Sequence, residues 1–393
     1  MRRDPLAFLT TELDALRDQG LHRTLRILEG RQEASARVDG RTVVNLSSNN
    51  YLGLTTHPKL AEAAIQATRD LGVGSGSVRT IAGTMAIHME LERRLAQFKK
   101  TEAVVVFQSG FAANAGTVSA VLTKDDVVIS DALNHASIID GCRLSKAGIK
   151  VFPHKDVAAA RAILQDLPAS QRKLLITDGV FSMDGDLGSL PDLCDLAEEF
   201  GCIMMVDDAH ASGVFGSNGR GTIDHFGMHG RVDIQVGTLS KAMGALGGYV
   251  AGSKDFIDFL YHRARPFLFS TSHPPAVAAT CLAAIDVLEQ EPQIIDRLWE
   301  NTRFFKGGLV SMGFDTGLSE SPITPVIAGD GSLAMKLSDR LFEEGVFAQG
   351  IAFPTVARDK ARVRTIVTAT HTRDELQFAL DAFKRVGGEL GLI

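Results

Sequence analysis

The sequence predicts an α/β fold with a mostly parallel central sheet, followed by a smaller C-terminal α+β domain. Two observations lead to this prediction. Between residues 101 and 275, short apolar runs alternate with helical patterns, as in buried strands joined by crossover helices. Over the last ~110 residues, long helical stretches with fewer strands replace this pattern. We therefore expect an N-terminal segment (1–50), a large domain (51–275) and a small domain (276–393).

The size and composition of the chain fit this prediction. Its 393 residues are enough for one large and one smaller domain, and 45% of them are hydrophobic against 22% charged. The formal net charge is −6 and no run of Lys or Arg occurs, which argues against nucleic acid as a partner. No stretch approaches the roughly 18 apolar residues of a membrane span, so we expect no membrane partner.

The first twenty residues contain two arginines and then apolar and charged residues at helical spacing. This pattern predicts a short amphipathic helix rather than a secretion signal, because the apolar core of such a signal is missing. The cysteines are scattered and form no C-x-x-C pair, so we expect small buried hydrophobes in a reducing compartment. They are Cys142, Cys194, Cys202 and Cys281. We therefore expect a cytoplasmic protein.

Seven apolar runs predict the strands of the central sheet, and continuous runs of this kind are typical of strands buried on both faces. They are AVVVF (103–107), VVISD (127–131), IKVFPH (149–154), KLLITDG (173–179), CIMMVDDAH (202–210), IQVGTLS (234–240) and GYVAGS (248–253). Amphipathic stretches such as SIIDGCRLSKA and PDLCDLAEEFG separate several of them. The alternation indicates crossover connections and a mostly parallel sheet.

The C-terminal part predicts a second layer of helices and strands. We expect, in order, a helical pattern (276–312), a strand (322–328), a helix (332–345), two strands (346–351 and 363–369) and a final helix. The final helix opens with Thr372 and Glu375, which have the spacing of a capping box. No Pro- or Ser-rich linker precedes this part, so we expect it to share a long helix or a packed interface with the large domain.

Polar and charged side chains follow five of the predicted strands at their carboxyl ends, where open α/β sheets bind ligands. These groups are the Ser109–Gly110 turn, His135, Ser182, Asp207 with Asp208 and His210, and Lys241. The glycine turn leads into a helix, whose first N–H groups are suited to a phosphate. We expect all of these groups to converge on one site.

One cofactor gives each of these groups a role. Pyridoxal phosphate (PLP) needs a lysine for a Schiff base, an anion beside its pyridinium nitrogen and a cradle for its phosphate. A ring stacked on the pyridine face completes the set. A metal site formed by Asp207, Asp208, His210 and His135 is the alternative, but it leaves Lys241 and the glycine turn without a role. We therefore expect PLP and no metal.

Nine segments, taken in their order along the chain, resemble the α-oxoamine synthases. The segments are NNYLG (49–53), AGTMAIHMELE (82–92), SGFAAN (109–114), SDALNHASIIDG (130–141), TDGVFSMDGD (177–186), VDDAH (206–210), GTLSKAMGALGGY (237–249), RPFLFSTSHPP (265–275) and ARVRTIVTATHT (361–372). This resemblance covers nearly the whole chain. It implies PLP-dependent fold type I, which is aspartate aminotransferase-like, and a condensation of an amino acid with an acyl-CoA.

The resemblance also implies roles for the residues around the cofactor ring. Lys241 would hold the cofactor as a Schiff base and serve as the catalytic base. Asp207 would keep the pyridine nitrogen protonated, and His135 would stack on the ring. His210 would contact the phenolic oxygen, with Ser182 nearby. We expect Lys241, His135 and Asp207 to be the catalytic residues.

At the phosphate end, the resemblance assigns residues from two subunits. The backbone N–H groups of Gly110 and Phe111 would bind the phosphate, together with Thr238. Ser270 and Thr271, in the FSTS motif, would reach the phosphate of the neighbouring subunit. The resemblance therefore implies a homodimer with shared active sites.

Asn49 and Arg364 would bind the carboxylate of the amino-acid substrate, because a guanidinium fork suits a carboxylate. His135 would contact the substrate as well. Arg23 and Arg26, in HRTLR (22–26), could bind a dicarboxylic acyl chain or lie at a solvated helix end, and we expect the second. An inactive relative acting as a regulator would usually lack the lysine, so we expect an enzyme.

The branch of the family decides the substrates. SDALNHASIIDG and the G-T…H-x-E-L-E spacing within 83–92 most resemble glycine C-acetyltransferase, also called 2-amino-3-ketobutyrate CoA ligase. That resemblance implies reversible condensation of glycine with acetyl-CoA to 2-amino-3-oxobutanoate and CoA, as in threonine degradation. The alternative is 8-amino-7-oxononanoate synthase, which joins alanine to pimeloyl-CoA with loss of CO₂ in biotin synthesis. A promiscuous enzyme with both activities is a third outcome.

Overall fold

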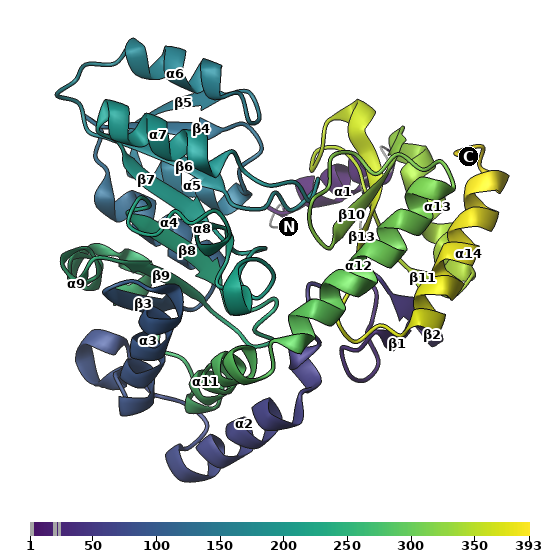
Figure 1. Cartoon of the computed structure of the whole chain (residues 1–393), viewed down its shortest axis with the longest axis horizontal. Coiled ribbons are helices and arrows are strands. Elements are labelled where there is room, and N and C mark those ends of the chain that lie inside the picture. The colour runs from purple at the N-terminus through teal and green to yellow at the C-terminus, as the bar shows by residue number, and fades with distance from the viewer. Residues whose placement is uncertain (1–3, 19–21, 23–24) are drawn as a thin grey trace.

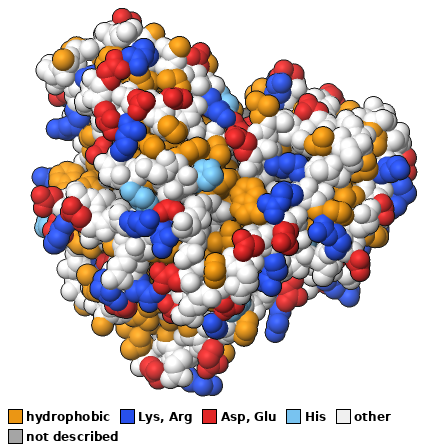
Figure 2. Space-filling model, in the orientation of Figure 1, with side chains coloured by type: hydrophobic (Ala, Val, Ile, Leu, Met, Phe, Trp, Pro, Cys, Tyr) orange, Lys and Arg blue, Asp and Glu red, His pale blue; other side chains and the backbone are white. Residues whose placement is uncertain are grey.

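The chain folds into a large part built on one sheet and a smaller part beside it, as the computed structural model shows (Figure 1). The structure describes residues 4–18, 22 and 25–393. Between the two parts the surface is notched, and hydrophobic and histidine side chains are visible at the notch (Figure 2). Within the described residues, no helix has the length and apolar character that crossing a membrane requires.

The central sheet confirms the predicted fold class. In sheet order its strands are β3 (Ala103–Phe107), β9 (Gly248–Gly252), β8 (Ile234–Thr238), β7 (Ile203–Asp207), β6 (Lys173–Asp178), β4 (Val127–Asp131) and β5 (Gly148–Phe152). Strand β9 runs antiparallel to both of its neighbours, and the strands from β8 to β5 are parallel. All seven predicted strands are present, and their residues are almost all buried except in the edge strand β5.

Helices cover both faces of this sheet. Successive residues of a strand point to opposite faces, and in these strands the residues on both faces are apolar. On β3, Val105 and Phe107 pack with one group of helices, whereas Val104 and Val106 pack with the other. The first group is α4 (Gly110–Val121), α5 (Ala136–Ser145), α9 (Lys254–Arg263) and α10 (Arg265–Leu268). The second is α3 (Ala86–Lys99), α6 (Val157–Gln165), α7 (Leu190–Phe200), α8 (Thr222–His225) and α11 (Pro275–Gln290).

The region 276–312, predicted as a helical pattern, is helical, and the chain forms two helices there. Helix α11 ends at Gln290, and α12 (Gln293–Ser311) begins after Pro292. Proline lacks the N–H that an uninterrupted helix would need at that position. The break lets α11 pack in the core of the large part while α12 runs into the smaller part (Figure 1).

The smaller part combines two short sheets with three helices around a core that includes Phe305 and Phe383. One sheet has the order β10 (Ile323–Gly329), β13 (Ala361–Ile366) and β12 (Gln349–Ile351). The other has the order β1 (Ser35–Val38), β2 (Arg41–Asn45) and β11 (Val346–Phe347). The helices are α12, α13 (Gly331–Glu343) and α14 (Arg373–Glu389). The predicted strand over 346–351 is therefore two strands in two sheets.

The predicted capping box at the start of α14 is confirmed. The Thr372 hydroxyl accepts from the Glu375 backbone N–H, and the Glu375 carboxylate accepts from the Thr372 backbone N–H at 2.8 Å. The N-terminal segment places β2 beside β11 of the smaller part, so it is not confined to a separate unit. The domain boundaries after residues 50 and 275 remain a prediction.

The other elements connect these layers. They are α1 (Phe8–Asp18), the 3₁₀ turn η1 (Leu54–Thr56), α2 (Pro58–Leu71), the π-helical turn η2 (Arg79–Gly83), and the 3₁₀ turns η3 (Ser217–Gly219) and η4 (Arg358–Lys360). Helix α1 lies within the predicted amphipathic stretch, and none of its residues is buried. Three of the cysteines are buried and Cys202 is partly buried, and all four are free thiols.

Candidate active site

A cavity of about 250 Å³ lies where β6, β7 and β8 end, with Asp178, Asp207 and Thr238 in its wall. It brings together eight of the residues predicted to bind the cofactor: Gly110, Phe111, His135, Ser182, Asp207, His210, Thr238 and Lys241. They come from five separate chain segments. The convergence expected from the strand ends therefore occurs in the structure.

Lys241 lies in the connection between β8 and β9, where its backbone carbonyl accepts from the Gly244 N–H at 2.9 Å. Gly244 has a φ of 68°, and a Cβ atom there would come within 2.7 Å of the Thr55 nitrogen. Only glycine fits this close turn without strain. Burial lowers the pKa of Lys241 to about 8, although nearby Asp207 acts in the opposite direction. A substantial fraction of the amine is therefore neutral and nucleophilic near neutral pH.

Asp207, the last residue of β7, is held by two donors. The Asn114 side-chain amide donates to Oδ2 at 2.6 Å, and the Ala209 backbone N–H donates to Oδ1 at 2.8 Å. Its neighbour across the sheet is Asp178, at the end of β6. Burial, reinforced by the charge of Asp207, raises the pKa of Asp178 well above its ordinary value. Asp207 is thus a fixed, water-poor carboxylate that can stabilise a cationic ring nitrogen.

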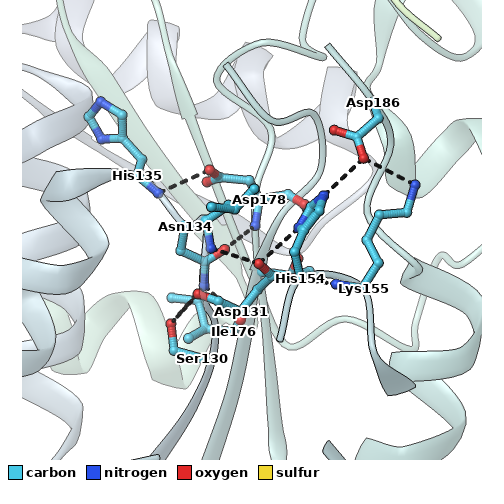
Figure 3. Close-up of polar contacts among 11 residues, drawn as sticks. Ser130, Asp131, Asn134, His135, His154, Lys155, Ile176, Asp178 and Asp186 are labelled. Atoms are coloured by element: carbon cyan, nitrogen blue, oxygen red, sulfur yellow. Dashed lines mark hydrogen bonds and ion pairs between the residues drawn. The ribbon is translucent and has the colours of Figure 1, made fainter. Parts of the chain in front are cut away.

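His135 caps the N-terminus of α5. Its Nδ1 atom lies 3.2 Å from the Ser137 backbone nitrogen and 2.7 Å from the Ser137 hydroxyl. The His135 backbone N–H donates to the Asp178 carboxylate at 3.0 Å, and the imidazole is turned away from that contact (Figure 3). Burial lowers the pKa of His135, so a neutral ring is favoured, as stacking on a cationic pyridine requires.

His210 lies deeper, with its Nδ1 atom 2.7 Å from the Tyr51 hydroxyl. Both side chains are buried. Burial holds the pKa of His210 well below its ordinary value, and the charges of Lys241 and Arg364 act in the same direction. His210 is therefore a neutral imidazole in contact with a phenol. Its protonated form would face two cations in a water-poor site.

The first N–H groups of α4 form the phosphate end of the cavity. The Ser109 hydroxyl accepts from the Ala112 N–H at 3.0 Å, which leaves the earlier N–H groups, those of Gly110 and Phe111, for a ligand. A Cβ atom on Gly110 would lie 3.4 Å from the Thr238 side chain. A partly buried lysine, a buried carboxylate and a free helix N-terminus around one cavity have the donor set that PLP requires.

The two residues predicted to bind the substrate carboxylate are in contact. Arg364 Nη2 donates to the Asn49 side-chain oxygen at 3.0 Å. Arg364 Nε is buried without a hydrogen-bond partner, and burial lowers the pKa of the guanidinium. Asn49 comes from the turn before η1 and Arg364 from β13. An unpartnered guanidinium N–H near Lys241 suits an incoming carboxylate.

Ser270 and Thr271 do not line the cavity of their own chain. Thr271 is exposed, forms an isolated bridge with Val78, and its carbonyl accepts from the Gln108 amide at 2.7 Å. The structure of one chain therefore does not bring these two residues to the other cofactor-binding groups. Their role in a neighbouring subunit remains a prediction.

The alternative metal site is not assembled. Asp208 is directed toward Lys99 Nζ, at 3.2 Å, and toward Thr222, rather than into the cavity with Asp207. Arg26 is exposed, as predicted, but it lies outside a helix, pairs with Asp39 at 3.1 Å and stacks on a phenylalanine ring. Arg23 lies outside the described residues.

Comparison with known proteins identifies the family. The sequence profile of aminotransferase class I and II matches residues 41–383. The chain belongs to this family. It is 62% identical to an 8-amino-7-oxononanoate synthase from Symbiobacterium thermophilum, over 98% of this chain and 99% of that one. It is 59% identical to a protein of the same name from Exiguobacterium sibiricum, over 98% and 99%.

Solved structures place the chain among the α-oxoamine synthases of this family. The serine palmitoyltransferase from S. paucimobilis, solved with a bound PLP–myriocin aldimine, superposes with a TM-score of 0.94 at 33% identity, covering 100% of both chains. The predicted fold type I, the α-oxoamine synthase resemblance and the PLP dependence are thus confirmed. The protein is a PLP-dependent enzyme of the α-oxoamine synthase type.

The prediction of a glycine C-acetyltransferase is wrong. The relatives at 62% and 59% identity carry the name of the alternative branch, 8-amino-7-oxononanoate synthase. One of the motifs behind the prediction, SDALNHASIIDG, contributes His135 and Ser137 to the cofactor cavity, and the other, within 83–92, lies in η2 and α3 away from that cavity. They say little about the acyl chain or the amino-acid side chain, where one methylene is worth about 1–3 kcal/mol.

Sequence reasoning missed several residues of the α-oxoamine synthase cavity. They are Asn114, Ser137, Asp178, Val180, Ala209 and Ser240. Asn114 had a signal, because it follows Gly110 by four residues on a predicted helix and so shares its face. Asp178 ends a predicted strand two strands away from Lys241. That position gave no indication that it would lie beside Asp207.

Proposed function

We propose that this chain is an 8-amino-7-oxononanoate synthase, which condenses alanine with pimeloyl-CoA and releases CoA and CO₂. The observation that carries the proposal is the convergence of Lys241, Asp207 and His135 on one cavity. The chain containing that cavity is 62% identical, over nearly its whole length, to a protein of this name.

The residues around the cavity would hold the cofactor at three points. Lys241 would bind its aldehyde carbon, Asp207 would pair with the ring nitrogen, and the N–H groups of Gly110 and Phe111 would bind the phosphate. When bound, PLP delocalises the negative charge that develops at the amino acid's Cα. Asn114, which donates to Asp207 at 2.6 Å, would keep that carboxylate aligned with the ring.

Lys241 would move the protons of the reaction. Its neutral amine, once free, can take the Cα proton, so that Cα can bond to the thioester carbonyl carbon. The C–S bond breaks, and CoA leaves with the electron pair of that bond and takes up a proton from solvent. Loss of CO₂ leaves an electron pair at Cα, which Lys241 can protonate. One proton is thus removed from Cα and one is returned.

Arg364 and Asn49 would bind the alanine carboxylate before that group is lost. The unpartnered Nε of Arg364 can donate to it without breaking the 3.0 Å contact with Asn49. The charge of Arg364 contributes to the lowered pKa of Lys241, as expected of two groups that lie near each other. A carboxylate bound at Arg364 would then lie near the base. This arrangement would orient Cα toward Lys241.

A second cavity supports a carboxylate-terminated acyl chain. It measures about 290 Å³, and its wall includes the apolar side chains of Leu28, Val38 and Ile351 as well as two arginines, Arg26 and Arg364. An apolar wall suits methylene groups, and an arginine suits a terminal carboxylate. Arg26 would have to share its charge between Asp39 and such a carboxylate.

We also propose that the active form is a homodimer with shared active sites. Phe269, next to Ser270 and Thr271, is 67% exposed, and Ile81 of η2 is 82% exposed. Helix α1 adds further apolar surface that no part of its own chain buries. The exposed apolar side chains of Phe269 and Ile81, beside a motif that does not reach its own cavity, support a partner subunit there.

A matrix of initial rates tests the proposed reaction. Alanine, glycine and serine would each be combined with pimeloyl-, heptanoyl-, acetyl- and palmitoyl-CoA, and thiol and CO₂ would be measured separately. We expect the highest kcat/KM for alanine with pimeloyl-CoA, with one CO₂ per thiol. Heptanoyl-CoA has the same chain length without the terminal carboxylate and should be a poorer substrate. The proposal is wrong if another pair exceeds alanine with pimeloyl-CoA by tenfold.

A further inference from the structure

His154, just after the edge strand β5, is held between two carboxylates (Figure 3). Its Nδ1 atom lies 3.0 Å from Asp131 Oδ1, and its Nε2 atom lies 2.9 Å from Asp186 Oδ2. The Asp131 and Asp186 side chains are only 1% and 5% exposed. None of these three residues lines the cofactor cavity, so the proposed reaction gives them no role.

The two contacts determine the protonation state of the ring. A neutral imidazole has one N–H and could donate to only one of the carboxylates. The other nitrogen would then present a lone pair to a buried anion. Both contacts are hydrogen bonds only when His154 is protonated, as a cation between two anions. Burial lowers the pKa of His154, but the hydrogen bonds to Asp131 and Asp186 outweigh it and raise the pKa to about 9.

Asp131 connects this cation to the turn that bears His135. Asp131 Oδ1 also accepts from the Leu133 backbone N–H at 2.8 Å. The next residue, Asn134, donates to the Ile176 carbonyl at 2.9 Å and accepts from the Asp178 N–H at 2.8 Å. The turn from β4 to α5 is therefore held by Asp131 on one side and by β6 on the other. Because His135 follows Asn134 directly, the position of this turn determines the position of the His135 ring.

Asp186 connects the same cation to the loop that bears Ser182. The Asp186 carbonyl accepts from the Phe181 N–H at 3.0 Å, which closes the loop around Ser182. The Phe181 ring packs edge-on against the His154 ring, with centroids 4.3 Å apart. His154 thus contacts both ends of this loop, Asp186 through a hydrogen bond and Phe181 through ring packing.

We propose that His154 is a positioning residue that sets the distance between the turn bearing His135 and the loop bearing Ser182. Both segments contribute to the cavity wall, through His135 and Ser182, whereas His154 lies outside it. The inference rests on the proposed roles of His135 and Ser182 at the cofactor. If the inference holds, the protonated His154 ring, which lies outside the cavity, determines how far apart His135 and Ser182 lie across it.

We call His154 with its two carboxylate partners, Asp131 and Asp186, the His154 clamp. The charges around His154 determine how the stability of this clamp depends on pH. Asp131 faces it from β4 and Asp186 from the loop after β6. Lys155 adds a positive charge 3.2 Å from Asp186 and also approaches Glu320 of the smaller part, at 3.7 Å. The folded pKa of His154 lies above the ordinary value of 6.5, so its stabilisation is complete below about pH 6.5. The stabilisation is lost as the pH rises through about 9.

The test combines a direct titration with a cofactor readout on the holoenzyme. Carbon-13 labelling of the imidazole rings allows the 11 histidines to be titrated by NMR, and the resonance missing from His154→Gln identifies His154. The matched control is His229→Gln. His229 also binds a carboxylate, Asp224 at 2.8 Å, and is similarly exposed, at 27% against 24%, but it does not line the cavity.

We expect the His154 resonance to stay at its protonated position up to about pH 8. His154→Gln should weaken PLP binding about tenfold at pH 7.5 and reduce the visible circular dichroism of the bound cofactor, whereas His229→Gln should change neither. A His154 resonance that titrates near pH 6.5 would overturn the proposal. Equal PLP affinity and dichroism in the two variants would overturn it as well.

A second variant covers the case in which His154→Gln does not fold. Asp186→Asn keeps the imidazole and an acceptor oxygen but removes one negative charge, so the His154 pKa should fall and the cofactor dichroism should decrease. If Asp186→Asn leaves both unchanged, the clamp does not exist. Neither readout uses a substrate, so this result is separate from the outcome of the substrate matrix.

Discussion

Lys241 shows how burial prepares a side chain for two tasks. The water-poor site lowers its pKa to about 8, while Asp207 keeps the value from falling further. A lysine with an ordinary pKa of about 10.4 would be almost fully protonated at neutral pH and unable to bind a carbonyl or accept a proton. The residue that holds the cofactor is thereby also suited to act as the base.

Borohydride reduction of the holoenzyme, followed by peptide mapping, should place the cofactor label on Lys241. Lys241→Ala should lose turnover by about a thousandfold or more, because both covalent attachment and the base are removed. Because the neutral amine reacts, holoenzyme formation from apoenzyme should accelerate with pH up to about 8 and then level off. Lys254→Ala, at an exposed lysine, is the control. A label on Lys254 or Lys146 would contradict the assignment.

Lys99 is a buried cation that serves the fold rather than the chemistry. It is 1% exposed and pairs with Asp208, which is fully buried one residue after Asp207. Its Nζ also donates to the Arg220 carbonyl, and the Asp208 carboxylate accepts from Thr222. The pair joins α3 to the segment that follows β7.

Lys99→Met should destabilise the protein by about 3–5 kcal/mol, because Asp208 would remain as an unpaired buried charge. Urea unfolding would measure the loss. The double variant Lys99→Met with Asp208→Asn removes both charges and should be more stable than the single variant. If the single and double variants unfold at the same urea concentration, the destabilisation comes from lost packing instead.

At the scale of elements, the strands and the final capping box could be predicted because their signals are local. Apolar runs such as 127–131 match their strands to within a residue or two. The break between α11 and α12 was missed because apolar residues keep helical spacing on both sides of Pro292. The division of 346–351 between two sheets depends on distant partners, β2 and β13, which no local pattern reveals.

The same contrast of local and distant signals applies to the site. The strand-end positions of Asp207 and Lys241 could be predicted from the sequence alone. The contact between Asn49 and Arg364 spans 315 residues and was expected only from the family resemblance. The network around His154 gave no signal at all, since its members lie on three segments whose spacing depends on the sheet order.

The loop between β6 and α7 is fitted closely against the smaller part at Gly185. This residue has a φ of 76°, and a Cβ atom would lie 2.3 Å from the Ile323 carbonyl oxygen. Two residues nearer the N-terminus, the Met183 carbonyl accepts from buried Arg362 of β13 at 2.9 Å. Ser182 thus lies next to a contact between the two parts of the molecule.

Gly185→Ala should therefore destabilise the protein by more than the roughly 1–2 kcal/mol that a left-handed backbone costs alone. Gly201→Ala is the matched control, because Gly201 has a φ of 61° and a Cβ atom at that position would meet nothing within 4 Å. Chemical denaturation of both variants separates the clash from the backbone strain. Equal losses of unfolding free energy in the two variants would show that the loop shifts to accommodate the Cβ atom, so that the contact with Ile323 is not tight.

At the scale of the whole molecule, the smaller part has a core of its own, while the core of the large part extends into the smaller part through Ile323 and Ile366. The residues proposed for the reaction come from both parts. Asp207 ends β7 and Lys241 follows β8 in the large part, and Arg364 belongs to β13 of the smaller one. The Arg362 pair with Asp184, at 2.6 Å, connects the same two units. Their relative position therefore determines whether a carboxylate at Arg364 would lie beside Lys241.

Mixed dimers test whether the sites are shared between subunits. Lys241→Ala and Thr271→Asp homodimers should each be inactive, because one lacks the base and the other places a negative charge at the partner's phosphate. In a heterodimer, one site collects both defects and the other collects neither. We expect about half of the normal activity per heterodimer. Stable heterodimers without any recovered activity would show that each chain has a self-contained site.

The buried cysteines make the reaction simple to record. Burial raises the pKa of Cys142, Cys194 and Cys202 to about 11 and that of Cys281 to about 12. At pH 8, only about one thiol in a thousand is therefore a reactive thiolate. A chromogenic thiol reagent added to the native enzyme would report the CoA released, with little colour from the protein. After denaturation the same reagent would find four thiols per chain, which gives the enzyme concentration in the same cuvette.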